Sequence, residues 1–223
     1  MPIQKSLENL QTELIACRRC ERLVLWRESV ANQKVKRFAT EEYWGKPVPS
    51  FGDPAARLLI VGLAPAAHGA NRTGRMFTGD NSGIWLYRAL HKAGFANQAE
   101  TLHKNDGLTL TDCYITAVIH CAPPDNKPLP TEITTCRSFL MEELDMLENV
   151  QVIVALGKIA FDEVLKALPA KKPKFAHGVE VELNNGLILI GSYHPSQQNT
   201  FTGKLTESML DAIFERVNYR LEY

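Results

Sequence analysis

Short apolar runs alternate with segments of helical periodicity along this chain. The run Leu58–Val61 is closed by Gly62, and comparable runs occupy residues 113–119 and 152–156. Runs of this kind are typical of strands buried on both faces of a parallel sheet. We therefore expect strands at residues 58–63, 113–119 and 152–156. We also expect a hairpin whose strands, residues 179–183 and 187–190, flank the turn Asn184-Asn185-Gly186.

Helices are expected between these strands. Leu7, Leu10 and Leu14 recur at helical spacing within residues 3–16, and Asp80, Asn81 and Ser82 are N-cap candidates for a helix that stops at Gly94. Further helices are expected from an N-cap at Thr131 to Met146, from Gly157-Lys158 onward, and over residues 205–217. Residues 24–56 and the Pro-rich residues 122–130 are expected to be loops. Strands that alternate with helices predict an α/β fold with a mostly parallel sheet covered on both faces.

Composition narrows the class of protein. A chain of 223 residues with 45% hydrophobic and 22% charged residues fits one soluble domain over residues 1–223. No apolar stretch approaches the ~20 residues of a membrane span, and the N-terminus lacks an apolar signal core, so we expect a cytoplasmic protein. The formal net charge of +0 argues against a broad basic surface for nucleic acid, but a local basic cleft remains compatible with it.

Four of the five cysteines form a candidate metal site. Cys17 and Cys20 form a CxxC pair after the first expected helix, Cys121 ends a strand, and Cys136 lies in a helix. Disulfides are disfavoured in the cytosol, so four thiolates suit a structural zinc or an iron–sulfur cluster, and spacing alone favours zinc. Cys113 lies within a strand pattern and is expected to be a small buried apolar residue.

The segment from Gly62 to Asp80 is the strongest candidate for a ligand-binding loop. It follows a buried strand, and its residues are small and kinked until Phe77. Such a loop lets a ligand approach the backbone, and the carboxyl ends of strands are where open α/β sheets bind ligands. His194-Pro195-Ser196 follows another apolar strand and is expected at the same edge.

Together these motifs resemble the uracil-DNA glycosylase superfamily, and in particular its family 5 branch, relatives of the family 4 iron–sulfur enzymes. The elements that carry the resemblance are Cys17-x-x-Cys20, the loop from Gly62 to Asp80, Cys121-Ala122-Pro123-Pro124-Asp125-Asn126, Cys136, the segment Ala155-Leu156-Gly157-Lys158-Ile159-Ala160, and His194-Pro195-Ser196-x-x-Asn199. The resemblance implies a three-layer α/β/α fold around a central, mostly parallel four-stranded sheet. It also implies a [4Fe–4S] cluster held by Cys17, Cys20, Cys121 and Cys136, which replaces the zinc preference.

Two departures bear on the substrate. Many superfamily members have an acidic or amide residue in the Gly-x-x-Pro segment to position water, whereas Gly62-Leu63-Ala64-Pro65 has none. Family 4 reads the uracil edge with an Asn where this chain has Ala117. Both departures are typical of family 5, and they imply a looser pocket that accepts several deaminated bases, such as uracil, hypoxanthine and xanthine.

Excision of a base breaks an N-glycosidic bond, so the site must stack the base, stabilise its developing negative charge and orient water. Phe77 is the expected stacking platform, and His194 the expected hydrogen-bond donor to the base. Asp80 is expected to orient water or to offset charge on the sugar, with helix capping as an equal alternative. Asn126 is the third catalytic candidate, with an Asx-turn as its alternative. His68 and Asn71 rank below Asp80.

The remaining expected contacts are with the nucleotide and the DNA backbone. The full set of expected substrate-binding residues is Gly62, Ala64, Ala66, His68, Phe77, Ala117, Ser82, Lys158, Ser196 and Asn199. Helix starts and short polar side chains suit phosphates. Residues 197–203 are expected to be a loop that probes the minor groove, with Phe201 as the wedge.

Two other classes of protein remain open. One is a non-catalytic nucleic-acid-binding protein held together by zinc or an iron–sulfur cluster. The other is an iron–sulfur electron carrier, which gives no reason for Phe77 or His194. We expect a monofunctional glycosylase, because no lysine is clearly placed in the pocket for a Schiff base. We also expect a monomer that acts on double- or single-stranded DNA containing uracil or other deaminated bases.

Overall fold

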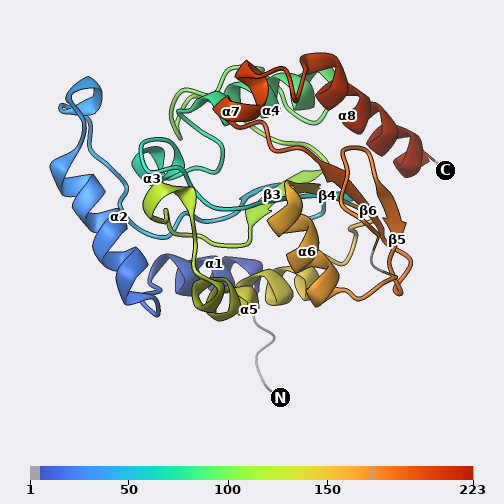
Figure 1. Cartoon of the computed structure of the whole chain (residues 1–223), viewed down its shortest axis with the longest axis horizontal. Coiled ribbons are helices and arrows are strands. Elements are labelled where there is room, and N and C mark those ends of the chain that lie inside the picture. Colours follow the sequence, from blue (N-terminus) through green and yellow to red (C-terminus); the bar gives the residue numbers. More distant parts are fainter. Residues whose placement is uncertain (1–5, 172, 223) are drawn as a thin grey trace.

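A six-stranded sheet forms the centre of the structure, a computed structural model that describes residues 6–171 and 173–222 (Figure 1). The strands are β1 (Phe51–Gly52), β2 (Leu58–Gly62), β3 (Cys113–Ala117), β4 (Val152–Leu156), β5 (Glu180–Glu182) and β6 (Ile188–Ser192). Their order across the sheet is β1-β3-β2-β4-β6-β5. The inner four strands are parallel, whereas β1 and β5 pair antiparallel at the two edges.

The expected four-stranded sheet is therefore correct for the parallel centre and too small for the whole. β1 lies in the segment that was expected to be a loop. It was missed because its two residues are too few to show an alternation of apolar and polar side chains. β5 forms the expected hairpin with β6. All five residues of β2, β3 and β4 are buried, which explains why their sequences are continuous apolar runs.

Helices cover both faces of the sheet (Figure 1). They are α1 (Leu7–Ile15), α2 (Glu21–Gln33), α3 (Ala70–Thr73), α4 (Asn81–Lys92), α5 (Pro130–Met146), α6 (Lys158–Ala167), α7 (Gln197–Phe201) and α8 (Glu207–Glu222), with 3-10 turns η1 (Lys36–Phe38) and η2 (Pro124–Asn126). Alternate strand residues divide the core: Leu58 and Ile60 pack with α4 and α8, and Leu59 and Val61 pack with α5 and α6. This is the expected three-layer α/β/α arrangement.

A third, small core cluster attaches the N-terminal helix. Leu10 and Leu14 of α1 pack on Phe139 of α5, and all three side chains are fully buried. Cys17 and Cys136 pack against this cluster. The first expected helix, residues 3–16, thus corresponds to α1, while residues 3–5 lie outside the described residues.

Four expectations about elements are wrong. Residues 24–33 were expected to be loop but belong to α2, whose buried face includes the charged Arg27, so its apolar periodicity is broken. The N-cap of α5 is Leu129 rather than Thr131, because Pro130 occupies the first helical position. Residues 197–201 form α7 rather than a loop, with Ser196 as N-cap. The last helix begins at Glu207 and extends to Glu222 instead of covering 205–217.

Among the described residues, no helix combines the length and the apolar character that crossing a membrane requires.

Candidate active site and cysteine pocket

The candidate active site lies at the carboxyl edge of the parallel strands. Gly62 at the end of β2 pairs with Ala117 of β3, and Leu156 of β4 pairs with Ser192 of β6. Hydrogen bonds continue past these ends, because the amide of Gly157 donates to the carbonyl of Ser192 at 2.8 Å. The segments that follow the four strands therefore leave the sheet along one edge, where α/β sheets bind ligands.

Phe77 and His194 meet at this edge. Their rings are stacked, with centroids 5.9 Å apart and planes inclined by 30°. A Cβ atom on Gly62 would lie 2.9 Å from Cζ of Phe77, so only glycine lets the ring lie this close to the end of β2. Phe77 itself has a φ of 51°, a left-handed conformation that is strained for a bulky residue. The structure thus brings together the expected stacking platform and the expected donor.

The backbone around His194 is held by its own segment. The side-chain amide of Asn199 donates to the carbonyl of His194 at 2.9 Å. The hydroxyl of Ser196 accepts a hydrogen bond from the backbone N–H of Asn199 and thereby caps α7. In this structure Ser196 and Asn199 therefore position His194, and their expected contacts with DNA stay predictions.

Burial lowers the pKa of His194 to about 4. The imidazole is consequently neutral at pH 7, and one ring nitrogen carries a proton that it can donate. A neutral donor is suited to a base that becomes anionic only as its bond to the sugar breaks.

Asp80 caps α4, as the capping alternative predicts. Its carboxylate accepts from the amide of Gly83 at 3.1 Å. The side chain also lies against Gly69, where a Cβ atom would stand 2.1 Å from Oδ2 of Asp80. Burial raises the pKa of Asp80, while hydrogen bonds from Gly83 and Ser82 and the charge of Arg72 oppose that rise. A catalytic role for Asp80 remains a prediction.

Two buried arginines shape the loop from Gly62 to Asp80, and sequence reasoning missed both. Arg72 donates to the carbonyls of His68 at 2.8 Å and Gly79 at 3.2 Å, and it pairs with Glu41. Arg75 pairs with the buried Asp106 at 2.7 Å. The only signal in the sequence was two charges in an otherwise small and kinked loop, and nothing there identified their distant partners.

The other polar candidates differ in their surroundings. Nδ1 of His68 lies 3.1 Å from the hydroxyl of Tyr43. Asn71 is fully buried, and its amide donates to the carbonyl of Arg27 at 3.3 Å, so it joins the loop to α2 instead of facing a nucleotide. Asn126 is exposed on η2 in a left-handed conformation, and its backbone amide donates to the carbonyl of Pro123 at 3.2 Å. No side-chain hydrogen bond of an Asx-turn is seen among the described residues, and neither is one to Phe77 or His194, so both alternatives for Asn126 stay predictions.

The other residues that were expected to contact the substrate differ in how far they are buried. Ala64, Ala66 and Ser82 are half-buried in the segments around the pair, while Ala117 is only 1% exposed at the end of β3. Lys158 is exposed at the start of α6, where its ammonium pairs with Asp162. No structural observation assigns these residues to DNA, so their roles stay predictions.

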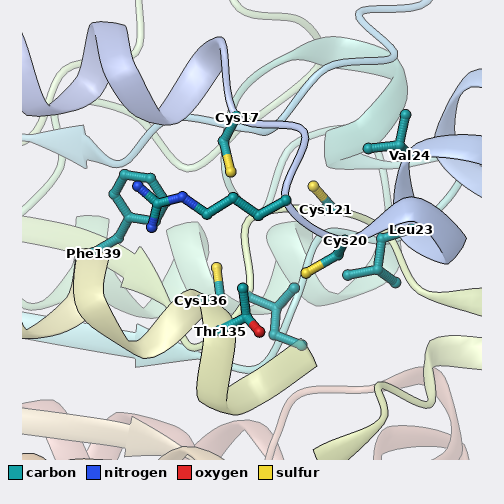
Figure 2. Close-up of a pocket in the computed structure, with 10 residues that line it drawn as sticks. Cys17, Cys20, Leu23, Val24, Cys121, Thr135, Cys136 and Phe139 are labelled. Carbon is teal, nitrogen blue, oxygen red and sulfur yellow. The ribbon is translucent and has the colours of Figure 1, made fainter. Parts of the chain in front are cut away.

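Cys17, Cys20, Cys121 and Cys136 line one pocket (Figure 2). Cys17 follows α1, Cys20 begins α2, Cys121 follows β3, and Cys136 lies in α5. Figure 2 shows their sulfur atoms turned toward a shared space beside Leu23, Val24 and Phe139. All five cysteines are unpaired, and Cys113 is fully buried in β3, as expected.

Burial raises the pKa of the Cys20 thiol, that of Cys121 to about 11 and that of Cys136 to about 12. Thiols in such surroundings ionise at neutral pH only when a strong positive charge, such as a metal, lies beside them. Over residues 6–171 and 173–222, no three His, Cys, Asp or Glu side chains lie close enough to hold a single metal ion.

Comparison with known proteins identifies the family. Residues 49–218 match the profile of the uracil DNA glycosylase superfamily. The chain is 53% identical over 214 residues to a type-5 uracil-DNA glycosylase of Mycobacterium leprae, covering 94% of this chain and 93% of that protein. The chain belongs to the uracil-DNA glycosylase superfamily.

Other relatives within the superfamily agree with this placement. A type-5 uracil-DNA glycosylase of Thermus thermophilus is 50% identical over 205 residues, covering 91% of this chain and 93% of that protein. A type-4 uracil-DNA glycosylase of Thermotoga maritima is 30% identical over 146 residues, covering 65% of this chain and 67% of that protein. The identity is higher to the type-5 relatives than to the type-4 relative, which agrees with the family 5 resemblance.

Proposed function

We propose that this chain is a monofunctional DNA glycosylase that excises uracil by hydrolysis of the N-glycosidic bond and leaves an abasic site for base excision repair. The type-5 relatives, which match this chain over more than nine-tenths of its length, support the reaction. The single observation that carries the proposal is the pair formed by Phe77 and His194 at the carboxyl edge of the sheet.

The geometry of this pair suits a flipped base. A base stacked on Phe77 lies parallel to its ring. The imidazole plane of His194 is inclined by only 30° to that ring, and its centroid lies 5.9 Å away. The N–H of the imidazole lies in its own plane, which is inclined by about the same 30° to a base stacked on Phe77. One residue can therefore hold the face of the base while the other donates to its edge.

The proposed chemistry depends on charge that develops during the reaction. The departing base gains negative charge, which the neutral imidazole of His194 stabilises by donating its proton in a hydrogen bond. The sugar gains positive charge, which the carboxylate of Asp80 offsets, or Asp80 orients the attacking water. Hydrolysis needs no lysine nucleophile, and the ammonium of Lys158 pairs with Asp162 on the surface of α6.

The proposed substrate range extends to other deaminated bases, such as hypoxanthine and xanthine. Ala117 and Ala64 present methyl groups where an edge-reading amide or a polar side chain would restrict the base. A site without such groups does not strongly reject analogues of its substrate.

The proposed cofactor is a [4Fe–4S] cluster held by Cys17, Cys20, Cys121 and Cys136. The residues fit it, because four thiols converge on one pocket that is otherwise lined mainly by apolar side chains, and the buried cation of Arg27 lies beside one of them. Thiolates are the usual ligands of iron–sulfur clusters. A bound cluster would supply a structural link between α1, α2, the segment after β3 and α5.

We further propose that the protein acts as a cytoplasmic monomer on double- or single-stranded DNA. Helix starts at Ser82, Lys158 and Ser196 would face phosphates. Phe201, at the end of α7, is 73% exposed and would fill the space that the flipped base vacates.

A panel of single-lesion duplexes tests the proposed function. Protein purified without air is incubated with duplexes that contain one uracil, hypoxanthine or xanthine, with a thymine duplex as control. We expect base release from the lesion duplexes, release from none of the controls, and no covalent adduct after borohydride treatment. DNA binding without base release would favour a non-catalytic binding protein, and a borohydride adduct would contradict hydrolysis.

A further inference from the structure

Arg27 is a buried cation that lacks a carboxylate partner of its own. Its side chain lies on the inner face of α2 and is 1% exposed as a residue. The nearest carboxylate oxygen is Oε1 of Glu28, at 3.8 Å from Nη2. That carboxylate is half-exposed and already accepts two hydrogen bonds from Arg18. A charge buried in this way costs several kcal/mol in general, unless an opposite charge lies beside it.

The guanidinium of Arg27 is directed at the cysteine pocket. Nη1 lies 3.6 Å from the sulfur of Cys121, and Nη2 donates to the carbonyl of Cys17 at 3.3 Å. Nε is buried and has no hydrogen-bond partner among the described residues. A permanent positive charge therefore lies beside the Cys121 thiol, just behind the side chains that line the pocket.

Arg19 provides a contrast within the same segment. Arg19 lines the pocket itself, but its side chain is 46% exposed, it pairs with Glu13 at 3.0 Å, and it lies over the ring of Phe139. Solvent and a carboxylate of its own compensate the charge of Arg19, whereas the buried Arg27 has only the longer contact with Glu28, which Arg18 already occupies.

We propose that Arg27 is the internal counter-cation of the iron–sulfur centre, which it stabilises by charge and by an N–H donated to the sulfur of Cys121. This inference rests on the cofactor proposed above. Four thiolates give such a centre a net negative charge, and one-electron reduction adds a further negative charge. A nearby cation and a hydrogen bond to sulfur both favour the more reduced state, because net charge and such hydrogen bonds set cluster potentials. Arg27 is a positioning residue and has no direct part in base excision.

The test compares reduction potentials of protein purified without air, measured by spectroelectrochemical titration, in wild type, Arg27→Met and the matched control Arg19→Met. Methionine retains an apolar stem and removes charge and donors. We expect Arg27→Met to have a more negative potential than wild type and to lose its visible absorbance several-fold faster with an iron chelator. We expect Arg19→Met to match wild type in both. Equal potentials in Arg27→Met and Arg19→Met would overturn the proposal.

A conservative pair keeps the test decisive if Arg27→Met does not fold. Arg27→Lys retains the charge but not the fork that reaches both Cys121 and Cys17, so we expect a smaller negative shift than for methionine, and no shift in Arg19→Lys. The same potential in both lysine variants would overturn the proposal. Wild-type protein without iron would instead disprove the cofactor, and iron-containing protein without uracil release would disprove the glycosylase, so these failures are distinguishable.

Discussion

The carboxylate of Asp80 lies directly against the α-carbon of Gly69. A Cβ atom at position 69 would stand 2.1 Å from Oδ2 of Asp80, so the loop can close over this side chain only because residue 69 is glycine. Asp80 is thereby fixed from two sides, by Gly69 and by the amide of Gly83. This close fit holds a carboxylate of raised pKa at the edge where Phe77 and His194 meet.

The variant Asp80→Asn distinguishes the role of Asp80 as a helix cap from a role of its negative charge. Asn and Asp are equivalent N-caps, so Asp80→Asn should retain stability, whereas Asp80→Ala should lose ~0.5–2 kcal/mol. If the carboxylate offsets charge on the sugar or orients water, both variants excise uracil more slowly than wild type. Single-turnover rates and thermal melts measure the two effects. An Asp80→Asn protein that excises at the native rate would leave Asp80 as a helix cap only.

His194→Ala should lower the single-turnover rate of uracil excision by ~10²–10³, because loss of one donor to a developing anion typically has that effect. Affinity for DNA should fall much less, since phosphate contacts contribute most of it. The exposed His91 on α4 provides a matched control, and His91→Ala should excise like wild type. Normal excision by His194→Ala would contradict the proposed mechanism.

Stability should fall as the pH is lowered from about 6.5 toward 4. Burial lowers the pKa of His194 to about 4 and lowers those of His120 and His177 as well. An unfolded histidine titrates at about 6.5, so below that pH the unfolded state binds protons that the folded state does not. Above it both states are neutral and the effect vanishes. Urea unfolding at several pH values gives the free energy of unfolding as a function of pH. Between about pH 6.5 and 4 this free energy should fall less steeply in His194→Gln than in wild type.

Iron content should depend on Cys17, Cys20, Cys121 and Cys136 and not on Cys113. We expect brown protein with equal amounts of iron and sulfide when it is purified without air. Cys17→Ala should lose colour and solubility, while Cys113→Ala should retain the iron and cost only ~1 kcal/mol, as is typical of a small buried truncation. Stoichiometric zinc without iron would refute the assignment, and so would a colourless Cys113→Ala protein beside a brown Cys17→Ala protein.

Ala117→Asn should narrow the range of excised bases toward uracil. The amide would lie at the end of β3, beside Gly62 of β2, and could read the edge of the base. Since position 117 is 1% exposed, an unsatisfied amide would also cost ~1–3 kcal/mol. Ala155→Asn on β4, equally buried, controls for that cost. We expect the ratio of hypoxanthine to uracil excision to fall in Ala117→Asn and to stay constant in Ala155→Asn.

The sequence pattern was sufficient for the buried strands and for placing the segments of Phe77 and His194 at strand ends, while the roles of the two residues came with the family resemblance. Continuous apolar runs identify buried strands, and parallel strands place their following segments at one edge. The convergence of the four cysteines was available only through family resemblance. Arg72 and Arg75 could not be placed, because their partners, Glu41 and Asp106, are far away in sequence. Arg27 could not be placed either, because its contact with Cys121 also joins distant parts of the sequence. Because Arg27 interrupts the apolar face of α2, the sequence of this helix lacks clear helical periodicity and was interpreted as a loop.

The small core that joins α1 to α5 has a consequence for how the protein matures. Leu10, Leu14 and Phe139 pack apart from the two larger cores that enclose the sheet, and Cys17 and Cys136 border them. The two larger cores therefore enclose most of the apolar surface, whereas the N-terminal arm, residues 6–20, is held by the small core, by hydrogen bonds of Gln11 with Glu143 and Ser50, and by the cysteine pocket. We expect maturation in two stages, with the sheet assembling first and the arm docking when metal arrives. Iron-starved cells should then accumulate a form whose N-terminal arm is clipped by proteases while the remainder survives.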